Sequence, residues 1–151
     1  MIRIRWMIRR DMPEVMSIEE RSFEEPWTEE YFISALRQRC CIGMVAEHDD
    51  MVLGYMIYEL HKHRLNVINF AVHPDSRHEG VGSTMIDKLI RKLTVNRRNQ
   101  ITFEVRESNL PFQLFLKKMG FKAKGVIKHY FDDTNEDAYF FIFKVTEEQD
   151  A

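Results

Sequence analysis

The alternation of apolar and polar residues divides the chain into short strands and helices. Apolar residues that alternate with polar ones, or that run together in short blocks, predict seven strands. These strands are expected at residues 2–6, 42–47, 52–60, 66–72, 101–105, 121–131 and 138–145. Apolar residues spaced three or four apart predict helices after Asp11, Thr28 and Asn109, and a further helix over residues 81–93.

The predicted order of elements is β α α β β β α β α β β. Strands joined by short turns pair antiparallel, as in the hairpin predicted around residues 48–50. The expected fold is therefore α/β, of the α+β type, with a mixed, mainly antiparallel seven-stranded sheet and helices on both faces.

Several residues mark the ends of the predicted helices. Asp11, followed three residues later by Glu14, has the spacing of a capping box. Thr28 and Asn109 are predicted to cap the second and fourth helices. Gly120 fits the position just after the fourth helix.

Length and charge narrow the class of protein. The chain has 151 residues, and since a usual domain has ~100–200 residues, we expect a single domain over residues 1–151. Twenty-two Lys and Arg residues against 24 Asp and Glu residues give a net charge of −2. A protein that coats nucleic acid needs a basic excess, so no direct nucleic-acid partner is expected.

Cysteine usage and hydropathy indicate the compartment. Cys40 and Cys41 are adjacent, and adjacent strand residues point to opposite faces, which disfavours a disulfide between them. No run approaches the ~18 apolar residues of a membrane span. The start of the chain has no apolar stretch of signal-peptide length. We expect a cytoplasmic protein with no metal site and no membrane partner.

The segment with the clearest chemistry is residues 72–84 (VHPDSRHEGVGST), which follows a strand and opens a helix. Gly80 and Gly82 let the backbone approach a ligand closely. The free N–H groups of the new helix, with its dipole, favour phosphate, and Arg77 adds charge-assisted hydrogen bonds. The alternative is an ordinary strand–helix loop whose glycines serve the turn.

A dinucleotide site of the Rossmann type is another interpretation of these residues. Its fingerprint requires a third glycine three residues after Gly82, where Met85 stands, although Glu104 lies at about the right distance for the acidic residue. A Rossmann strand also opens a βαβ unit, whereas a strand, two helices and a hairpin precede this one. A Walker-type phosphate loop is excluded because no Gly-Lys-Ser/Thr follows.

The loop resembles the acetyl-CoA motif of the GNAT N-acetyltransferases, through Arg77-x-x-Gly80-x-Gly82 after Val72-x-Pro74. The predicted order of elements also matches that family over almost the whole chain. The resemblance implies an enzyme that uses acetyl-CoA as cosubstrate and needs no metal. In the family, the strand before the loop pairs with the pantetheine arm, and the loop and helix hold the pyrophosphate. The residues carried over are Phe70, Ala71 and Val72 for the arm, and Arg77, His78, Glu79, Gly80, Val81, Gly82 and Ser83 for the pyrophosphate.

Further segments resemble those GNAT enzymes that acetylate the N-terminal alanine of a bacterial ribosomal protein. They are residues 20–28 (ERSFEEPWT), 104–109 (EVRESN), 119–121 (MGF) and 136–138 (EDA). The resemblance implies direct transfer, in a ternary complex, to the N-terminal α-amine of a protein or peptide, for which a ribosomal protein is a candidate.

The resemblance also implies roles for four residues. Glu104 matches the general base, and its apolar strand neighbours favour a raised pKa through desolvation. Asn109 matches the residue that contacts CoA near the thiol, in addition to its role as a helix cap. Trp27 and Tyr130 match positions that border the substrate peptide. The alternatives are a hydrophobic anchor for Trp27 and a half-buried strand aromatic for Tyr130.

One position departs from the family pattern. These enzymes place a tyrosine seven residues after the asparagine, as the general acid for the leaving thiolate, and here that position is Leu116. Three accounts stay open. Water or another tyrosine such as Tyr130 supplies the proton, the thiolate leaves without one, or the chain binds acetyl-CoA without catalysing well.

Two other functions stay open at this point. One is transfer to a small cationic amine, which an acidic acceptor groove would favour; the acidic residues near Trp27 are Glu24, Glu25, Glu29 and Glu30. The other is a non-catalytic acetyl-CoA-binding module, which is considered because Leu116 stands where the family has its general-acid tyrosine.

Overall fold

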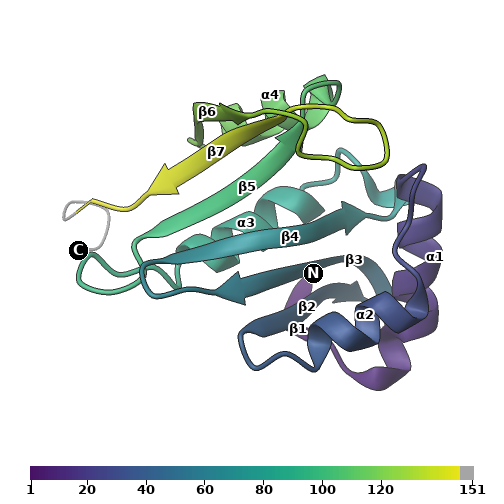
Figure 1. Cartoon of the computed structure of the whole chain (residues 1–151). Coiled ribbons are helices and arrows are strands. Elements are labelled where there is room, and N and C mark those ends of the chain that lie inside the picture. Colours follow the sequence, from purple (N-terminus) through teal and green to yellow (C-terminus); the bar gives the residue numbers. More distant parts are fainter. Residues whose placement is uncertain (147–151) are drawn as a thin grey trace. The chain divides into compact units, whose positions relative to one another are not determined.

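The computed structural model describes residues 1–146, and residues 147–151 of the expected domain lie outside the described part. Its helices and strands follow the predicted order (Figure 1). The strands are β1 (Arg3–Trp6), β2 (Cys41–His48), β3 (Met51–Leu60), β4 (Arg64–Val72), β5 (Gln100–Arg106), β6 (Lys122–Ile127) and β7 (Ala138–Lys144). The α-helices are α1 (Met12–Ser22), α2 (Glu29–Leu36), α3 (Val81–Ile90) and α4 (Leu110–Lys118), and the short 3-10 turns η1 (Arg9–Asp11) and η2 (Pro74–Ser76) come before α1 and α3. Within residues 1–146, no helix has both the length and the apolar character needed to cross a lipid bilayer.

The seven strands are hydrogen-bonded in the order β1-β2-β3-β4-β5-β7-β6. The pairs β1–β2, β2–β3, β5–β7 and β6–β7 are antiparallel, which confirms the predicted mainly antiparallel sheet. The chain forms two compact units. The first comprises Met1–Leu60 and Val67–Leu89, and the second comprises His61–Asn66 and Ile90–Ala151.

The first unit has helices on both faces of its strands (Figure 1). Adjacent strand residues point to opposite faces. On β3, Tyr55 packs edge-on against Phe32 of α2, with 5.9 Å between the ring centroids. The preceding residue, Gly54, faces α3, and a Cβ there would lie 3.0 Å from the Ala71 carbonyl and 3.3 Å from the Met85 sulfur. Glycine thus allows α3 to pack closely, and the expected helices on both faces are confirmed.

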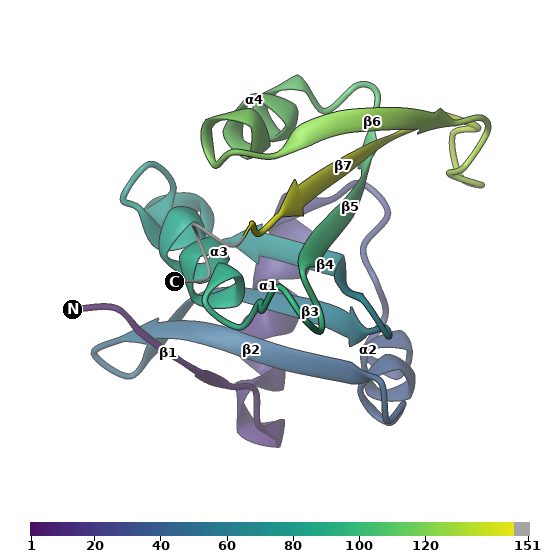
Figure 2. The same ribbon diagram turned by 90° about the vertical axis from the view of Figure 1, so that its left-hand side faces the viewer.

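In the second unit, α4 lies beside the end at which β6 begins (Figure 2). The Phe103 ring of β5 packs edge-on against Phe112 of α4 at 5.3 Å and against Phe121 at 5.5 Å between centroids. β6 pairs with β7 through a register shift between Ala123 and Gly125. The aromatic contacts fix α4, and with it the residues at its start, against the end of β5.

β6 ends at Ile127, four residues before the predicted end. His129 has a left-handed φ of 53°, and its N–H donates to the Asp137 carboxylate at 2.9 Å. The chain therefore turns out of the sheet, and Tyr130 lies in an exposed loop. The prediction of a strand up to residue 131, and with it a strand aromatic at Tyr130, is wrong.

Three of the predicted helix ends are confirmed. Thr28 Oγ1 accepts the Tyr31 N–H at 3.1 Å, and Asn109 Oδ1 accepts the Phe112 N–H at 3.3 Å. Gly120 follows α4 with a φ of 95°, a conformation that suits glycine at this position.

The predicted capping box at the start of α1 is wrong. The Asp11 carboxylate accepts two hydrogen bonds from Arg5, each of 2.8 Å, and one from the Ile8 N–H at 2.8 Å. Glu14 accepts the Val52 N–H of β3 at 2.9 Å. The turn η1 already gives Asp11 a helical φ of −76° and ψ of −17°, so its side chain does not reach the first N–H groups of α1.

Candidate functional site

The predicted cosubstrate segment lies in the first unit, between the end of β4 and the start of α3. Phe70, Ala71 and Val72 are the last three residues of β4. His73 then donates its backbone N–H to the Leu53 carbonyl at 2.7 Å, which ties this strand end to β3. Pro74 opens η2 and, because proline has no N–H to give to a ladder, the chain leaves the sheet there.

Gly80 sets the point at which α3 begins. Its φ of 82° is one that glycine adopts without strain. Its carbonyl accepts the Thr84 N–H at 3.0 Å and the Thr84 hydroxyl at 2.7 Å, which closes the first helical turn. In that turn, the N–H groups of Val81, Gly82 and Ser83 have no carbonyl partner within the helix. The residues just before the helix are exposed, so this partly positive helix end is open to an anion such as phosphate.

Arg77 is held by two hydrogen bonds within the first unit. Its Nε donates to the Val72 carbonyl and its Nη2 to Ser22 Oγ, both at 3.1 Å. Arg77 therefore joins the end of β4 to α1, and its contact with a phosphate remains a prediction. Ser22 was not among the predicted site residues, because it lies 55 residues before Arg77 and no motif links them.

Trp27, in the loop between α1 and α2, is anchored in two ways. Its ring packs on Tyr31 and Phe32 of α2, with centroid distances of 4.6 and 5.0 Å. Its backbone N–H donates to Glu19 Oε2 at 2.9 Å. The ring thus acts as a hydrophobic anchor, and its contact with a substrate peptide remains a prediction.

Glu19 of α1 was missed among the predicted site residues. Its carboxylate is buried, and Oε1 accepts hydrogen bonds from the Tyr55 hydroxyl and from Asn69 Nδ2, the latter at 2.8 Å. Burial and then the charge of Glu19 raise the pKa of Tyr55 far above its usual range, so the phenol stays protonated and donates. The available signal was an acidic residue four positions after the buried Val15, on the apolar face of the helix.

Glu104, the predicted general base, lies in β5 of the second unit and is half-buried. Because strand neighbours alternate, Glu104 and Arg106 share one face of β5, while Phe103 points to the opposite face and packs against α4. The carboxylate therefore stands on the face of β5 that α4 does not cover.

Asn109 matches the family pattern, and Leu116, seven residues later, departs from it. Asn109 is exposed and caps α4, so a contact with CoA remains compatible with its position. Leu116, seven residues later, is completely buried in α4 and its side chain carries no proton to give. The position of the family's general acid is here part of the packed core.

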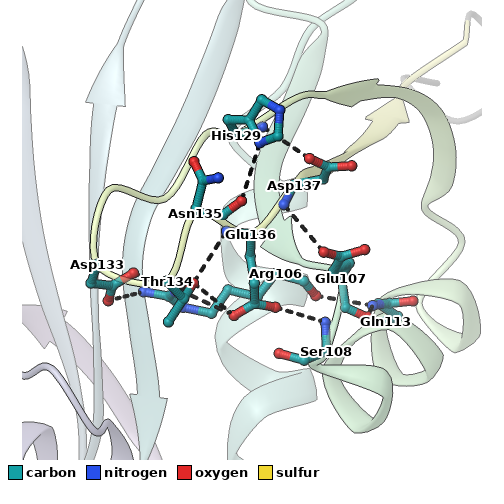
Figure 3. A network of polar contacts seen from close by, with 10 residues as sticks. All are labelled: Arg106, Glu107, Ser108, Gln113, His129, Asp133, Thr134, Asn135, Glu136 and Asp137. Carbon is teal, nitrogen blue, oxygen red and sulfur yellow. Dashed lines mark hydrogen bonds and ion pairs between the residues drawn. The ribbon is translucent and has the colours of Figure 1, made fainter.

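Arg106 and the loop between β6 and β7 form a polar network in the second unit (Figure 3). A hydrogen bond from Arg106 lowers the pKa of Asp133, and hydrogen bonds from Ser108 lower the pKa of Glu136. A hydrogen bond to Asp133 raises the pKa of Arg106. All three groups are therefore charged at neutral pH. Tyr130 belongs to this loop and is 44% exposed.

The predicted site residues fall into both units. Residues 70–83 and Trp27 belong to the first, and Glu104, Asn109 and Tyr130 belong to the second. Among residues 1–146, no three His, Cys, Asp or Glu side chains are grouped as ligands of a metal ion would be.

Comparison with known proteins gives a consistent result. A model of the Acetyltransferase (GNAT) family matches residues 12–121. A Bacillus subtilis protein, provisionally named a ribosomal protein bS18-alanine N-acetyltransferase, is 30% identical over 136 residues, which cover 89% of this chain and 90% of the relative. The Escherichia coli K12 ribosomal protein bS18-alanine N-acetyltransferase is 27% identical over 130 residues, covering 85% of this chain and 87% of that protein. The crystal structure of the ribosomal-protein-S18-alanine N-acetyltransferase from Escherichia coli has a TM-score of 0.84 at 24% identity, covering 97% of this chain and 95% of that chain, which shows a shared fold.

Proposed function

We propose that this chain, which belongs to the GNAT acetyltransferase family, transfers acetyl from acetyl-CoA to the N-terminal α-amine of a protein or peptide. The main support for this proposal is the accessible N-terminus of α3, which follows Gly80 and the loop after β4. The likeness to bacterial bS18-alanine N-acetyltransferases over most of the chain supports a ribosomal protein as the acceptor. We further propose that residues 1–151 form one acetyltransferase domain, which acts in the cytoplasm.

The residues present fit acetyl-CoA as cosubstrate. The N–H groups of Val81, Gly82 and Ser83 are suited to a pyrophosphate, and the residues from Arg77 to Gly80 stand exposed beside them. Phe70, Ala71 and Val72 offer backbone groups at the end of β4 for the pantetheine arm, as when a peptide is added to a sheet edge. When bound, acetyl-CoA supplies the acetyl group as a thioester.

Glu104 is assigned as the general base, directly or through a water. The neutral α-amine bonds to the acetyl carbon, Glu104 takes the proton that the amine nitrogen then loses, and the C–S bond breaks to release the CoA thiolate. An α-amine has a pKa of about 7.7–8.0, against about 10.4 for lysine, so a carboxylate base suits an N-terminal acceptor better.

The leaving thiolate needs no proton from α4. Leu116 cannot donate one, and a thiol pKa near 8.5 makes release of the thiolate at neutral pH a small cost. Water then protonates it. Trp27 and Tyr130 are assigned to contacts with the acceptor peptide.

A turnover assay on defined acceptors tests this function. Acetyl-CoA turnover, measured by release of free thiol, would be compared on short peptides with Ala, Met or Ser at the N-terminus, including the first residues of ribosomal protein bS18. Each peptide has an N-terminally blocked copy as its control, and a panel of small amines runs beside them. Turnover on free peptides that is lost on the blocked copies supports the proposal. Turnover on small amines alone, or binding of acetyl-CoA without any transfer, contradicts it.

A further inference from the structure

Arg106 is the centre of a polar network that the proposed reaction does not use (Figure 3). Its Nη1 and Nη2 donate to the two carboxylate oxygens of Asp133 at 2.9 and 2.7 Å. Nη1 also lies 3.2 Å from Thr134 Oγ1 and 3.4 Å from Glu136 Oε1. A bidentate pair between arginine and a carboxylate is charge-assisted and fixes the orientation of both groups.

Arg106 also reaches the aromatic residues at the start of the loop. Its guanidinium carbon lies 4.0 Å from the centre of the Phe131 ring, which is within the range of a cation–π contact. The Phe131 ring in turn meets the Tyr130 ring edge-on, with 4.9 Å between centroids. One side chain of β5 thereby holds both the acidic part of the loop and the aromatic pair next to it.

The loop is tied to the end of β5 at further points. Glu136 Oε2 accepts the Ser108 N–H at 3.1 Å, and Glu107 Oε1 accepts the Asp137 N–H at 3.4 Å. Asp137 accepts the N–H of His129, whose left-handed φ marks where β6 leaves the sheet. These bonds hold both ends of the loop, and Arg106 holds its middle.

The position of Arg106 on the strand links the loop to the proposed base. Glu104 and Arg106 are two residues apart on the same face of β5, and a rise of about 3.3 Å per residue places their Cα atoms about 7 Å apart. The residue that holds the loop therefore shares a strand face with the proposed general base.

We propose that Arg106 is a positioning residue for the acceptor: it holds the loop between β6 and β7 rigid, so that Tyr130 forms a preformed wall for the acceptor peptide. This inference rests on the proposed function. A wall that is ordered before binding lowers the entropy that the peptide must lose. Loss of Arg106 should therefore weaken peptide binding more than the chemical step.

The test is Arg106→Gln, with Arg64→Gln as matched control. Arg64 is also a strand arginine of the second unit, but it contacts Thr102 and Phe140 rather than the loop. We expect Arg106→Gln to raise the KM for the peptide about tenfold, with kcat and the KM for acetyl-CoA within about twofold. Arg106→Lys should restore part of the loss, because lysine keeps the charge but cannot pair bidentately. Arg64→Gln should leave the peptide KM within about twofold.

A second measurement reads the loop without any acetyl transfer. Chymotrypsin cleaves after aromatic residues, and Tyr130 and Phe131 give it two sites in this loop. We expect cleavage there to be about tenfold faster in Arg106→Gln and also faster in Asp133→Asn. The double variant should be no faster than Arg106→Gln alone, because that change already removes the pair. Cleavage sites would be identified by mass spectrometry.

The outcomes separate this inference from the function on which it rests. Cleavage and peptide KM that are both unchanged in a folded Arg106→Gln protein would overturn the role of Arg106 and leave the proposed function standing. An equal effect of Arg64→Gln would overturn it as well, because it would show a general loss of stability. No turnover on any peptide by the wild-type protein would overturn the acceptor role together with the proposed function, even if the loop opens as expected.

Discussion

Glu104 has a position in its strand that suits a general base. It is half-buried in β5, so its carboxylate is partly shielded from water. Its neighbour on the same strand face, Arg106, already has its charge paired with Asp133. The same face of β5 therefore carries the proposed base and the arginine that holds the loop.

Replacing Glu104 by glutamine keeps the size of the side chain and removes its basicity. We expect kcat for peptide acetylation to fall about 100- to 10,000-fold in Glu104→Gln, the usual loss for a general base, with the peptide KM within about threefold. Thiol release under saturating peptide measures this. Asp87→Asn, an exposed acid of α3, is the control for loss of one negative charge. Wild-type kcat in a folded Glu104→Gln protein would remove Glu104 from the mechanism.

Leu116 differs from the family tyrosine in volume as well as in chemistry. The side chain is completely buried, so Leu116→Tyr should overpack the core and lower the free energy of unfolding by about 1–3 kcal/mol. Leu116→Met, which nearly conserves volume, should cost less than about 1.5 kcal/mol. Urea denaturation measures both. Because the thiolate leaves readily, we also expect kcat in Leu116→Tyr to rise less than about twofold. A variant as stable as the wild type with a kcat ten times higher would show that the missing acid limits this enzyme.

At the residue scale, the sequence could predict side chains that act through neighbours along the chain. Thr28 and Asn109 bond to N–H groups three residues later, and the pattern of residues 77–82 is local. Glu19 bonds to Tyr55 and Asn69, 36 and 50 residues away. Spacing carries no information on such pairs, and the same holds for Arg106 and Asp133.

At the scale of the elements, Glu19 joins α1, the loop before α2, and strands β3 and β4. Removing its carboxylate in Glu19→Ala would leave the Tyr55 hydroxyl, the Asn69 amide and the Trp27 N–H without their acceptor. Tyr55 and Asn69 are buried, and each buried donor left unsatisfied costs about 1–3 kcal/mol, so we expect the free energy of unfolding to fall by at least about 2 kcal/mol. Glu20→Ala, at the exposed neighbouring position, should stay within about 0.5 kcal/mol. Equal losses in the two variants, measured by urea denaturation, would contradict this account.

A second element-scale prediction concerns pH. Burial alone would raise the pKa of Asp11, but the hydrogen bonds from Arg5 and the Ile8 N–H outweigh it and lower the pKa below its ordinary value of 3.8. A carboxyl with a lowered folded pKa stabilises the fold fully above its unfolded pKa, and the contribution is lost as pH falls through the folded value. We therefore expect the stability of the wild type to be steady near pH 6 and to fall below about pH 4.

Asp11→Asn provides the comparison for that prediction. The variant lacks the titrating group, so it should start less stable at pH 6 and lose less stability than the wild type on acidification. Urea midpoints at several pH values between 3 and 7 measure this. Parallel curves for the two proteins would show that Asp11 makes no contribution to the acid transition.

The periodicity of apolar residues predicted the order of the helices and strands, but not where each of them ends. The hydrophobic pattern predicted β6 up to residue 131, because Val126, Ile127, Tyr130 and Phe131 read as a strand. The strand stops earlier because the Asp137 carboxylate captures the His129 N–H. The end of this strand thus depends on a side chain eight residues away. The alternation of apolar and polar residues, which predicts strands, does not indicate such a contact.

At the scale of the whole molecule, the residues proposed for the reaction are distributed over both compact units. Residues 70–83, proposed for the cosubstrate, belong to the first unit, and Glu104, the proposed general base, belongs to the second. The GNAT family model matches residues 12–121, which include parts of both units. Periodicity predicted seven strands but not that β7 lies between β5 and β6. That order depends on pairs such as Gln100 with Lys144, which are distant along the chain.

Binding of acetyl-CoA should stabilise the whole fold, and Gly80 should control how much. A ligand at 100 times its Kd adds about 2.7 kcal/mol, and at about 2–4 °C per kcal/mol this raises Tm by about 5–11 °C. Gly80 has a φ of 82°, so a side chain there strains the backbone by about 1–3 kcal/mol and moves the N–H groups at the start of α3. We expect Gly80→Ala to weaken acetyl-CoA binding about tenfold, which halves the stabilisation to about 1.4 kcal/mol at the same ligand concentration.

The matched control for Gly80 is Gly125 of β6. A Cβ at Gly125 would meet no atom within 4 Å, so Gly125→Ala should keep the full thermal shift. Because the acetyl-CoA shift is measured against each variant without ligand, any loss of intrinsic stability in Gly80→Ala cancels. A full shift in Gly80→Ala would mean that the anion does not bind at the start of α3, and the cosubstrate would have to be placed elsewhere in the chain.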